Sequence, residues 1–164
     1  MELKKHLNLK YIFIGIYVAS FLAFIIYGLM PAKAVEAYDI EGEVVIPSIG
    51  LMSDVAKVEL TAEGLETPDT IVGSYSRNQN KTLLFGHSTT VFTDLKKVKL
   101  GDYIEYDGNN YEVRAIDMLA KSKINMDKLL KAEDKDTLVI MTCAGTLLDG
   151  GDATHRLIIT ASIE

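Results

Sequence analysis

From Val44 onward the chain consists of short apolar runs separated by turn residues, and this pattern constrains the fold more than any other feature. Each run has the length of a β-strand, and several are rich in β-branched or aromatic residues. Only residues 88–97 and 126–131 look helical, the second starting near Asn125. Seven or eight short strands with at most two helical turns predict an all-β domain, closed or sandwiched. The runs are residues 44–50, 54–60, 82–85, 103–106, 111–116, 137–142 and 156–162.

One hairpin can be located within this pattern. Asp107-Gly-Asn-Asn110 is rich in turn residues and joins two runs with alternating polarity. Because successive strand residues point to opposite faces, Ile104 and Tyr106 should lie on the face opposite Tyr103 and Glu105. The alternation therefore predicts a hairpin with two distinct faces.

The N-terminal part contains a continuous apolar segment. Residues 11–30 carry no charge, and twenty helical residues at about 1.5 Å each can cross a hydrocarbon core of about 30 Å. Three lysines precede the segment, and positively charged flanks stay on the cytoplasmic side. These features predict a cytoplasmic tail (1–10), a transmembrane anchor (11–30) and an extracellular remainder attached to the cell membrane.

A cleaved signal peptide is the alternative, since Ala32-Lys33-Ala34 has the small residues of a cleavage site. The apolar part of a signal peptide usually spans only about 7–15 residues, which favours an uncleaved anchor. Residues 31–43 are polar and small, as in a tether, and residues 44–164 form the predicted domain.

Charge and cysteine content narrow the function. Without Glu2 and the three lysines before residue 11, the chain has 14 basic and 22 acidic residues. Such an acidic domain does not suit nucleic acid, whose phosphates require a basic surface. The single cysteine, Cys143, excludes an internal disulfide, so it is either a small core residue or a free thiol kept for its reactivity.

The position of Cys143 favours reactivity. It directly follows the run Thr137–Thr142 and precedes Ala144-Gly145, so the thiol should lie at a strand end beside a flexible loop. A thiol attacks a carbonyl as the thiolate and therefore needs a neighbouring base or positive charge.

The predicted domain offers two histidines as the base. His87 ends the run that begins at Lys81, where its ring can approach a cleft; the alternative is an ordinary surface histidine. His155 is adjacent to Arg156, and strand neighbours point to opposite faces. If Arg156 faces the thiol, His155 does not, unless a bulge breaks the alternation.

Arg156 is the third candidate. Acyl transfer builds negative charge on a carbonyl oxygen, and a guanidinium, which keeps its proton, can stabilise that charge. The alternative is a surface salt bridge with Asp152 or Asp149. His87, Cys143 and Arg156 together, each near a strand end, indicate an acyl-transfer site.

The chain resembles the sortases, which are cysteine transpeptidases that anchor surface proteins to cell walls or polymerise pilins. The resemblance runs from about Val44 to Glu164. It rests on four stretches: Val45-Ile-Pro-Ser-Ile-Gly-Leu, Leu84-Phe-Gly-His87, Thr142-Cys143, and His155-Arg-Leu-Ile-Ile-Thr-Ala161. An N-terminal anchor fits the same family.

The resemblance implies a closed eight-stranded β-barrel that cleaves an LPXTG-like sorting signal after its threonine. Cys143 would form the thioacyl enzyme, His87 would protonate the leaving amine, and Arg156 would hold the oxyanion or the substrate backbone. An amine of a peptidoglycan precursor or a pilin lysine would then resolve the intermediate. Residues 118–136 would form the substrate-recognising loop. The predicted substrate contacts are Thr142, Ala144, Ile124 and Met126, with Leu129 and Leu130 as further apolar wall; core packing is the alternative for each.

Two departures from the family pattern bear on subclass. Val139 and Ile140 stand where the family signature has Thr and Leu, and residues 73–80 contain no carboxylate. Calcium-stimulated class A members keep ligands in that segment, so no calcium site, metal or other cofactor is expected. The chain looks like a small sortase near classes A, E and F.

The competing interpretation is a membrane-anchored β-domain without enzymatic activity, with a structural or adhesive role. It would tolerate loss of the thiol. An L,D-type transpeptidase is disfavoured because the chain has no Ser-His-Gly-Cys run.

Overall fold

The computed structural model describes residues 16–21, 38–62, 64–148 and 152–163. The chain divides into two units, Met1–Ala37 and Tyr38–Glu164. In the first unit, residues 16–21 are helical and exposed. Within the described ranges, no helix is both long and apolar enough to span a membrane. The predicted tail, most of the predicted anchor and residues 31–37 of the predicted tether lie outside the described residues.

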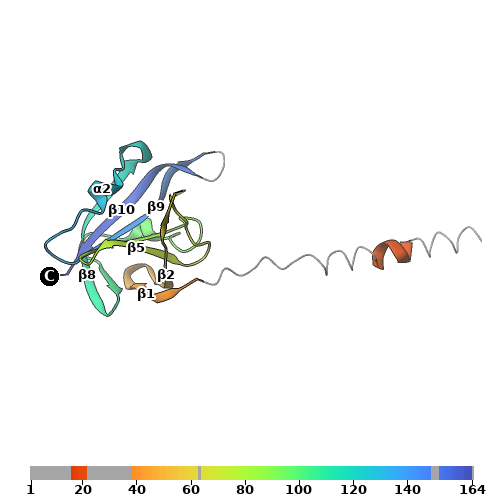
Figure 1. The fold of residues 1–164 in the computed structure, drawn as a ribbon, viewed down its shortest axis with the longest axis horizontal. Coiled ribbons are helices and arrows are strands. Elements are labelled where there is room, and N and C mark those ends of the chain that lie inside the picture. The colour runs from red at the N-terminus through yellow and green to blue at the C-terminus, as the bar shows by residue number, and fades with distance from the viewer. Residues whose placement is uncertain (1–15, 22–37, 63, 149–151, 164) are drawn as a thin grey trace, which may run out of the picture. The chain divides into compact units, whose positions relative to one another are not determined.

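The second unit is an all-β closed barrel of eight strands (Figure 1). The barrel strands are β1 (Ile40–Ile46), β2 (Leu51–Lys57), β5 (Val72–Asn78), β6 (Lys81–Gly86), β7 (Tyr103–Tyr106), β8 (Asn109–Ala120), β9 (Thr137–Leu147) and β10 (Ala153–Ser162). The short strands β3 (Leu60–Thr61) and β4 (Gly64–Leu65) pair separately. The helical pieces are η1 (Pro47–Ile49), η2 (Leu95–Lys97), η3 (Lys121–Lys123) and α2 (Met126–Leu129). The predicted fold class is thus confirmed for this unit.

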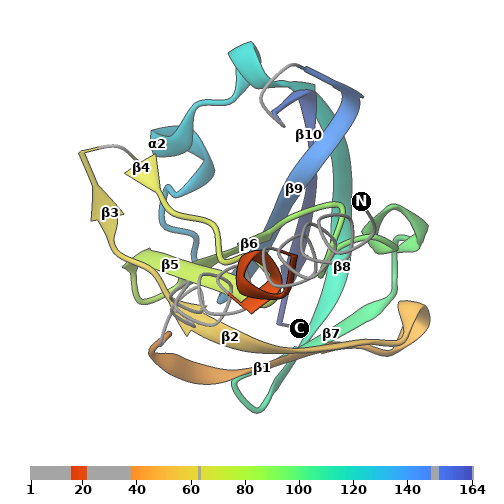
Figure 2. The ribbon, with the colours of Figure 1, turned by 90° about the vertical axis from the view of Figure 1, so that its right-hand side faces the viewer.

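The order around the barrel is β1-β2-β5-β6-β9-β10-β8-β7, and β7 pairs with β1 to close it (Figure 2). The pairs β2–β5 and β6–β9 are parallel, and the remaining pairs are antiparallel. Parallel neighbours need a long crossover connection. In the barrel, β9 lies between β6 and β10. In the chain, β7 and β8 separate β6 from β9, whereas β10 follows β9 directly.

The predicted hairpin is present between β7 and β8. Its two turn residues, Asp107 and Gly108, have φ of 49° and 71°, as a tight two-residue turn requires. Ile104 is fully buried and Tyr106 is 9% exposed, whereas Tyr103 is 52% exposed. The predicted separation of these side chains onto opposite faces is therefore confirmed, and the face of Ile104 and Tyr106 is the buried one.

Apolar side chains form two separate clusters. The inner cluster takes residues from all eight barrel strands and from the segment 92–98, and fills the barrel. The outer cluster covers the outside of β6, β9 and β10. Alternation along each strand separates the two sets: Leu138 and Ile140 of β9 face inward, whereas Val139 faces outward.

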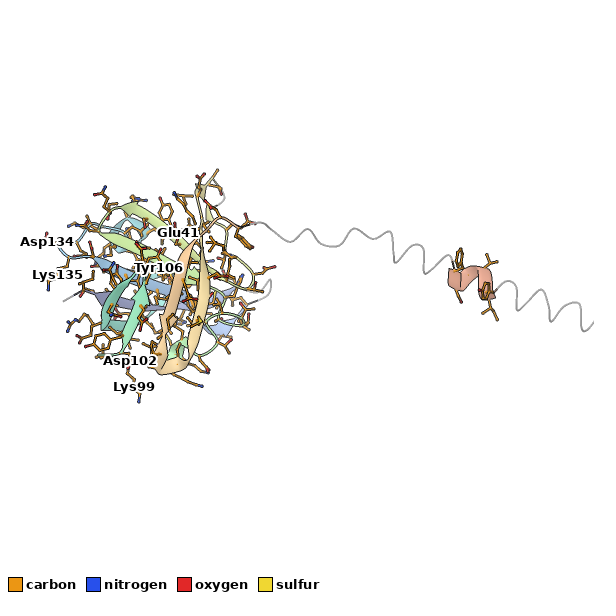
Figure 3. All side chains as sticks on the ribbon, turned by 90° about the horizontal axis from the view of Figure 1, so that it is seen from below. Glu41, Lys99, Asp102, Tyr106, Asp134 and Lys135 are labelled. Atoms are coloured by element: carbon orange, nitrogen blue, oxygen red, sulfur yellow. The ribbon has the colours of Figure 1, made fainter. Side chains whose placement is uncertain are left out.

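Strand β1 begins at Ile40, so it takes up the last four residues of the segment predicted as a tether. Glu41 in this strand accepts hydrogen bonds from Ser74 and from the hydroxyl of Tyr106, the latter at 3.0 Å. Figure 3 shows Glu41 and Tyr106 next to each other. Burial, followed by the charge of Glu41, raises the pKa of Tyr106. These contacts join β1, β5 and β7.

Of the two segments predicted to be helical, one forms a helix and the other does not. The short helix near Asn125 exists as α2, and the side chain of Asn125 caps it by accepting from the amide of Lys128 at 3.0 Å. The weak helical pattern at 88–97 instead forms a series of turns that ends in η2. Strand β5 was not among the predicted strands.

Candidate active site

Three neighbouring strands bring the predicted catalytic residues to one level of the barrel. Arg156 of β10 is paired directly with Cys143 of β9. On the other side of β9, Gly86 at the end of β6 is paired with Thr142, and His87 is the next residue. Residues that are distant in sequence are therefore adjacent across the sheet.

Cys143 and Arg156 belong to the outer face. Cys143 is on the same face of β9 as Val139, and Arg156 is on the same face of β10 as Ile158; Val139 and Ile158 are in the outer cluster. His87 directly follows β6, whose residues Leu83 and Phe85 are in the same cluster. Cys143 and His87 are half-buried, and the Arg156 side chain is 15% exposed. The arrangement gives a thiol flanked by an imidazole-bearing segment and a guanidinium-bearing strand.

The backbone around His87 is held on both sides. Its carbonyl accepts from the amides of Phe92 at 3.0 Å and Thr90 at 3.4 Å, which folds the following segment back. A Cβ at Gly86 would lie 2.6 Å from Cγ1 of Val91, so this packing requires glycine. The Thr142 hydroxyl donates to the Gly86 carbonyl at 2.7 Å. These contacts fix the exit of the chain from β6.

The buried hydroxyl of Thr142 gives a first prediction. Thr142→Val keeps the shape but removes the hydrogen bond to Gly86, so the free energy of unfolding should fall by about 1–2 kcal/mol. Urea denaturation measures this loss, and Thr142→Ser, which keeps the hydroxyl, is the matched control. A valine variant as stable as the wild type would show that the bond contributes nothing net.

Arg156 is bonded to its own strand and to the preceding loop. Its Nη1 donates to the carbonyls of Ala153 and His155, both at 3.0 Å, and Nη2 donates to Oδ1 of Asp152 at 2.7 Å. The salt bridge with Asp152 that the sequence offered as an alternative is therefore present. The backbone of Arg156 is paired opposite Cys143, while its guanidinium is bonded to residues 152–155.

His155 belongs to the other side of β10. It pairs with Ala144, which packs against the inner cluster, and its Nδ1 lies 2.8 Å from Oγ1 of Thr154. A register shift lies between Ala153 and His155, which is the bulge considered from the sequence. The pairing is regular from His155 to Arg156, so the alternation between these two residues is preserved.

The four predicted substrate contacts separate into two groups. Ile124 and Met126 are half-buried and pack against the outer cluster, on the face that carries Cys143. Thr142 is 4% exposed and Ala144 packs inward. Only the backbone of Thr142 and Ala144 can therefore reach a peptide bound on the outer face.

The hairpin between β5 and β6 holds the connection that carries Ile124 and Met126. Arg77 pairs with Asp127 at 2.6 Å, and Asn78 donates to the carbonyl of Leu130 at 3.0 Å. The Lys81 side chain, only 7% exposed, pairs with Glu133 at 2.9 Å. These contacts could not be predicted from the sequence, because nothing local to the hairpin indicates which segment it touches.

Comparisons with known proteins identify the family. The Sortase domain family model matches residues 44–164. Sortase A from Corynebacterium diphtheriae, a lid mutant, aligns at 26% identity with a TM-score of 0.59, over 80% of this chain and 73% of that one. No curated protein matches the chain.

Two further solved structures share the fold. Sortase A from Listeria monocytogenes aligns at 18% identity with a TM-score of 0.60, covering 77% of this chain and 88% of that one. Sortase C-1 from Actinomyces oris aligns at 24% identity with a TM-score of 0.58, covering 80% and 76%. The family model spans most of the chain, and the protein therefore belongs to the sortases, a family of cysteine transpeptidases.

Proposed function

We propose that the protein is a membrane-anchored cysteine transpeptidase that cleaves an LPXTG-like sorting signal after its threonine and transfers the acyl group to an amine. The observation that carries this proposal is the placement of His87, Cys143 and Arg156 at one level of three adjacent strands. The partners would be surface proteins or pilins with a sorting signal. The acceptor would be a peptidoglycan precursor or a pilin lysine.

Each residue has a distinct role in this reaction. Sγ of Cys143 attacks the threonine carbonyl and forms the thioacyl bond as the threonine–glycine bond breaks. His87 delivers the proton to the leaving amine. Arg156 donates to the developing oxyanion or to the substrate backbone. An acceptor amine then attacks the thioester and releases the thiol.

The outer cluster supports a binding groove for the sorting signal. Ile124 and Met126, both half-buried, would form its wall, and they pack against the buried members of the cluster, which include Leu83 and Val139. An extended peptide with an apolar residue near its start suits such a wall, because burial of one large aliphatic side chain contributes about 1.5–3 kcal/mol. The backbone of Thr142 and Ala144 would face the scissile region.

The location follows from the sequence. Residues 11–30 would anchor the protein in the cell membrane as a single pass with the N-terminus in the cytoplasm, so that the barrel lies outside. A thiol enzyme at this location meets sorting signals of exported proteins directly.

Peptide ligation tests the function. The purified barrel unit (38–164) is incubated with a library of sorting-signal peptides, with and without an amine such as triglycine. We expect a thioacyl adduct on Cys143 in intact-mass spectra and a ligated product when the amine is present. Absence of both across the library would favour the structural or adhesive interpretation.

Arg156→Lys should not restore activity although it conserves charge. A guanidinium presents five donors in a fixed plane, and three of them already hold Ala153, His155 and Asp152. An ammonium has only three donors around one point, so kcat/KM should fall about 10²-fold, as when one oxyanion donor is removed. Arg114→Lys, on β8, is the matched control. Normal turnover in the Arg156 variant would make the residue a structural ion pair only.

Calcium should not stimulate the enzyme. The cationic side chains of Arg77 and Lys81 already occupy the acidic partners Asp127 and Glu133 that hold the β8–β9 connection in place. Peptide cleavage should therefore be the same in millimolar calcium and in excess chelator. A rate that rises with calcium would contradict this account of the connection.

A further inference from the structure

Asp152 is the centre of a set of contacts around Arg156. Its Oδ1 accepts from Nη2 of Arg156 at 2.7 Å and from the amide of Ala153 at 2.8 Å. Its other oxygen accepts from Nζ of Lys121, and its backbone carbonyl accepts from the amide of Leu148 at 2.7 Å. Both the backbone and the side chain of Asp152 are therefore fixed.

The contacts leave part of the guanidinium open. Of its five N–H donors, Nη1 uses two on the carbonyls of Ala153 and His155, and Nη2 uses one on Asp152. Among the described residues, no further acceptor is bonded to Arg156, which leaves Nε–H and one Nη2 hydrogen. The side chain is thus held by one part of its donor set, while the other part has no acceptor among the described residues and would be available to a substrate oxygen.

Such a clamp suits a residue that must stabilise developing charge. An arginine side chain has much rotamer freedom, and ordering it during the reaction would add to the barrier. Donors that are oriented beforehand avoid that contribution. Lys121, followed by Arg156 and the amide of Ala153, holds the pKa of Asp152 well below its usual range. Asp152 therefore remains a carboxylate at any pH at which a thiol enzyme works.

We infer that Asp152 is a positioning residue for the acyl-transfer reaction: through its bond to Nη2 it holds in one orientation the guanidinium of Arg156, the residue paired with Cys143. This inference rests on the proposed function. Asp152 does not touch the substrate, and it acts through Arg156. Lys121, at the start of the β8–β9 connection, holds the second carboxylate oxygen and has the smaller role.

A readout without substrate tests the clamp itself. The chain contains three arginines, Arg77, Arg114 and Arg156, so their Nε–H resonances in an 15N-labelled sample can be assigned with Arg156→Lys. In Asp152→Asn, the Arg156 resonance should shift and its guanidinium rotation should become faster, while those of Arg77 and Arg114 stay in place. An unchanged Arg156 resonance would overturn the inference.

Kinetics test the consequence for catalysis. Asp152→Ala and Asp152→Asn should lower kcat by about 10- to 100-fold, the scale of displacing a reacting group by about 1 Å, with little change in KM. Asp152→Glu should recover much of the loss, because it restores the carboxylate. Lys121→Met should keep most of kcat, since the bond between Asp152 and Arg156 remains. Asp94→Asn, which breaks an exposed pair with Lys97, is the control and should have no effect.

The outcomes distinguish failure of the positioning role of Asp152 from failure of the proposed function. Wild-type kcat in Asp152→Ala, a loss confined to KM, or failure of Asp152→Glu to recover activity would each overturn the positioning role. Thermal denaturation of every variant verifies folding, and Asp152→Asn, which keeps the acceptor for the Ala153 amide, serves if the alanine variant unfolds. If the wild type forms no thioacyl product, the proposed function fails, while the resonance comparison still decides whether Asp152 holds Arg156.

Discussion

Cys143→Ala should give a folded barrel that forms no covalent adduct with a sorting-signal peptide and cleaves none of it. The substitution removes the only thiol in the chain, which lies half-buried on the outer face opposite Arg156. Removal of a nucleophile that carries a covalent intermediate costs on the order of 10⁴-fold or more in rate. Cleavage followed by chromatography and intact-mass spectrometry measures both effects.

The alanine variant must be compared at equal folded fraction. Because the thiol is half-buried and packs on the outside of β9, its loss should change the free energy of unfolding by about 1 kcal/mol or less. A variant that unfolds at the wild-type urea concentration but is inactive supports a chemical role. Unimpaired cleavage by this variant, or a wild-type adduct on another residue, would refute the role of Cys143.

His87→Ala should lower transpeptidation by about 10³-fold, within the range for loss of a general acid–base group, whereas His155→Ala should keep most of it. The two variants are a matched pair, since both remove a half-buried imidazole at the same end of the barrel. His87 follows the residue paired with Thr142, next to Cys143. His155 pairs with Ala144 and contacts Thr154.

One peptide, assayed with both variants, decides the assignment. A modest loss in His155→Ala is expected, because an added Cβ on Gly145 would lie 2.8 Å from Nδ1 of His155, so the ring packs on the part of β9 that follows Cys143. Near-normal turnover in His87→Ala together with loss of activity in His155→Ala would mean that the base is wrongly assigned.

The strands whose signals are local were predictable from the sequence. The β7–β8 hairpin follows from alternation and an Asp-Gly turn, and α2 follows from the capping residue Asn125. Strand β5 was missed because Val72–Asn78 contains glycine, serine, arginine and asparagine, which have low strand propensity. It is a strand because β2 and β6 supply hydrogen-bond partners on both sides, and such long-range pairing leaves no local pattern.

The sequence pointed to the residues of the candidate site but not to the contacts that hold them in place. The resemblance to sortases pointed to His87, Cys143 and Arg156, and alternation separated His155 from Arg156. The expectation that Cys143 ends a strand beside a loop was wrong, because β9 continues past it to Leu147. The inward direction of Thr142 follows from the same alternation once the outward direction of Cys143 is known. The bond between Asp152 and Lys121 joins two loops distant in sequence, and no spacing rule could have indicated it.

The parallel pairing of β6 with β9 links catalytic competence to the last stage of folding. His87 and Cys143 are 56 positions apart, and their strands cannot meet until the whole intervening chain has been closed into a loop. Contacts of such long range form slowly, because the entropy of loop closure opposes them until the surrounding structure is in place. A chain in which β6 and β9 have not yet paired therefore carries a thiol without its adjacent acid, even where the local β9–β10 pair has formed. Activity during refolding should appear with the closed barrel and not before it.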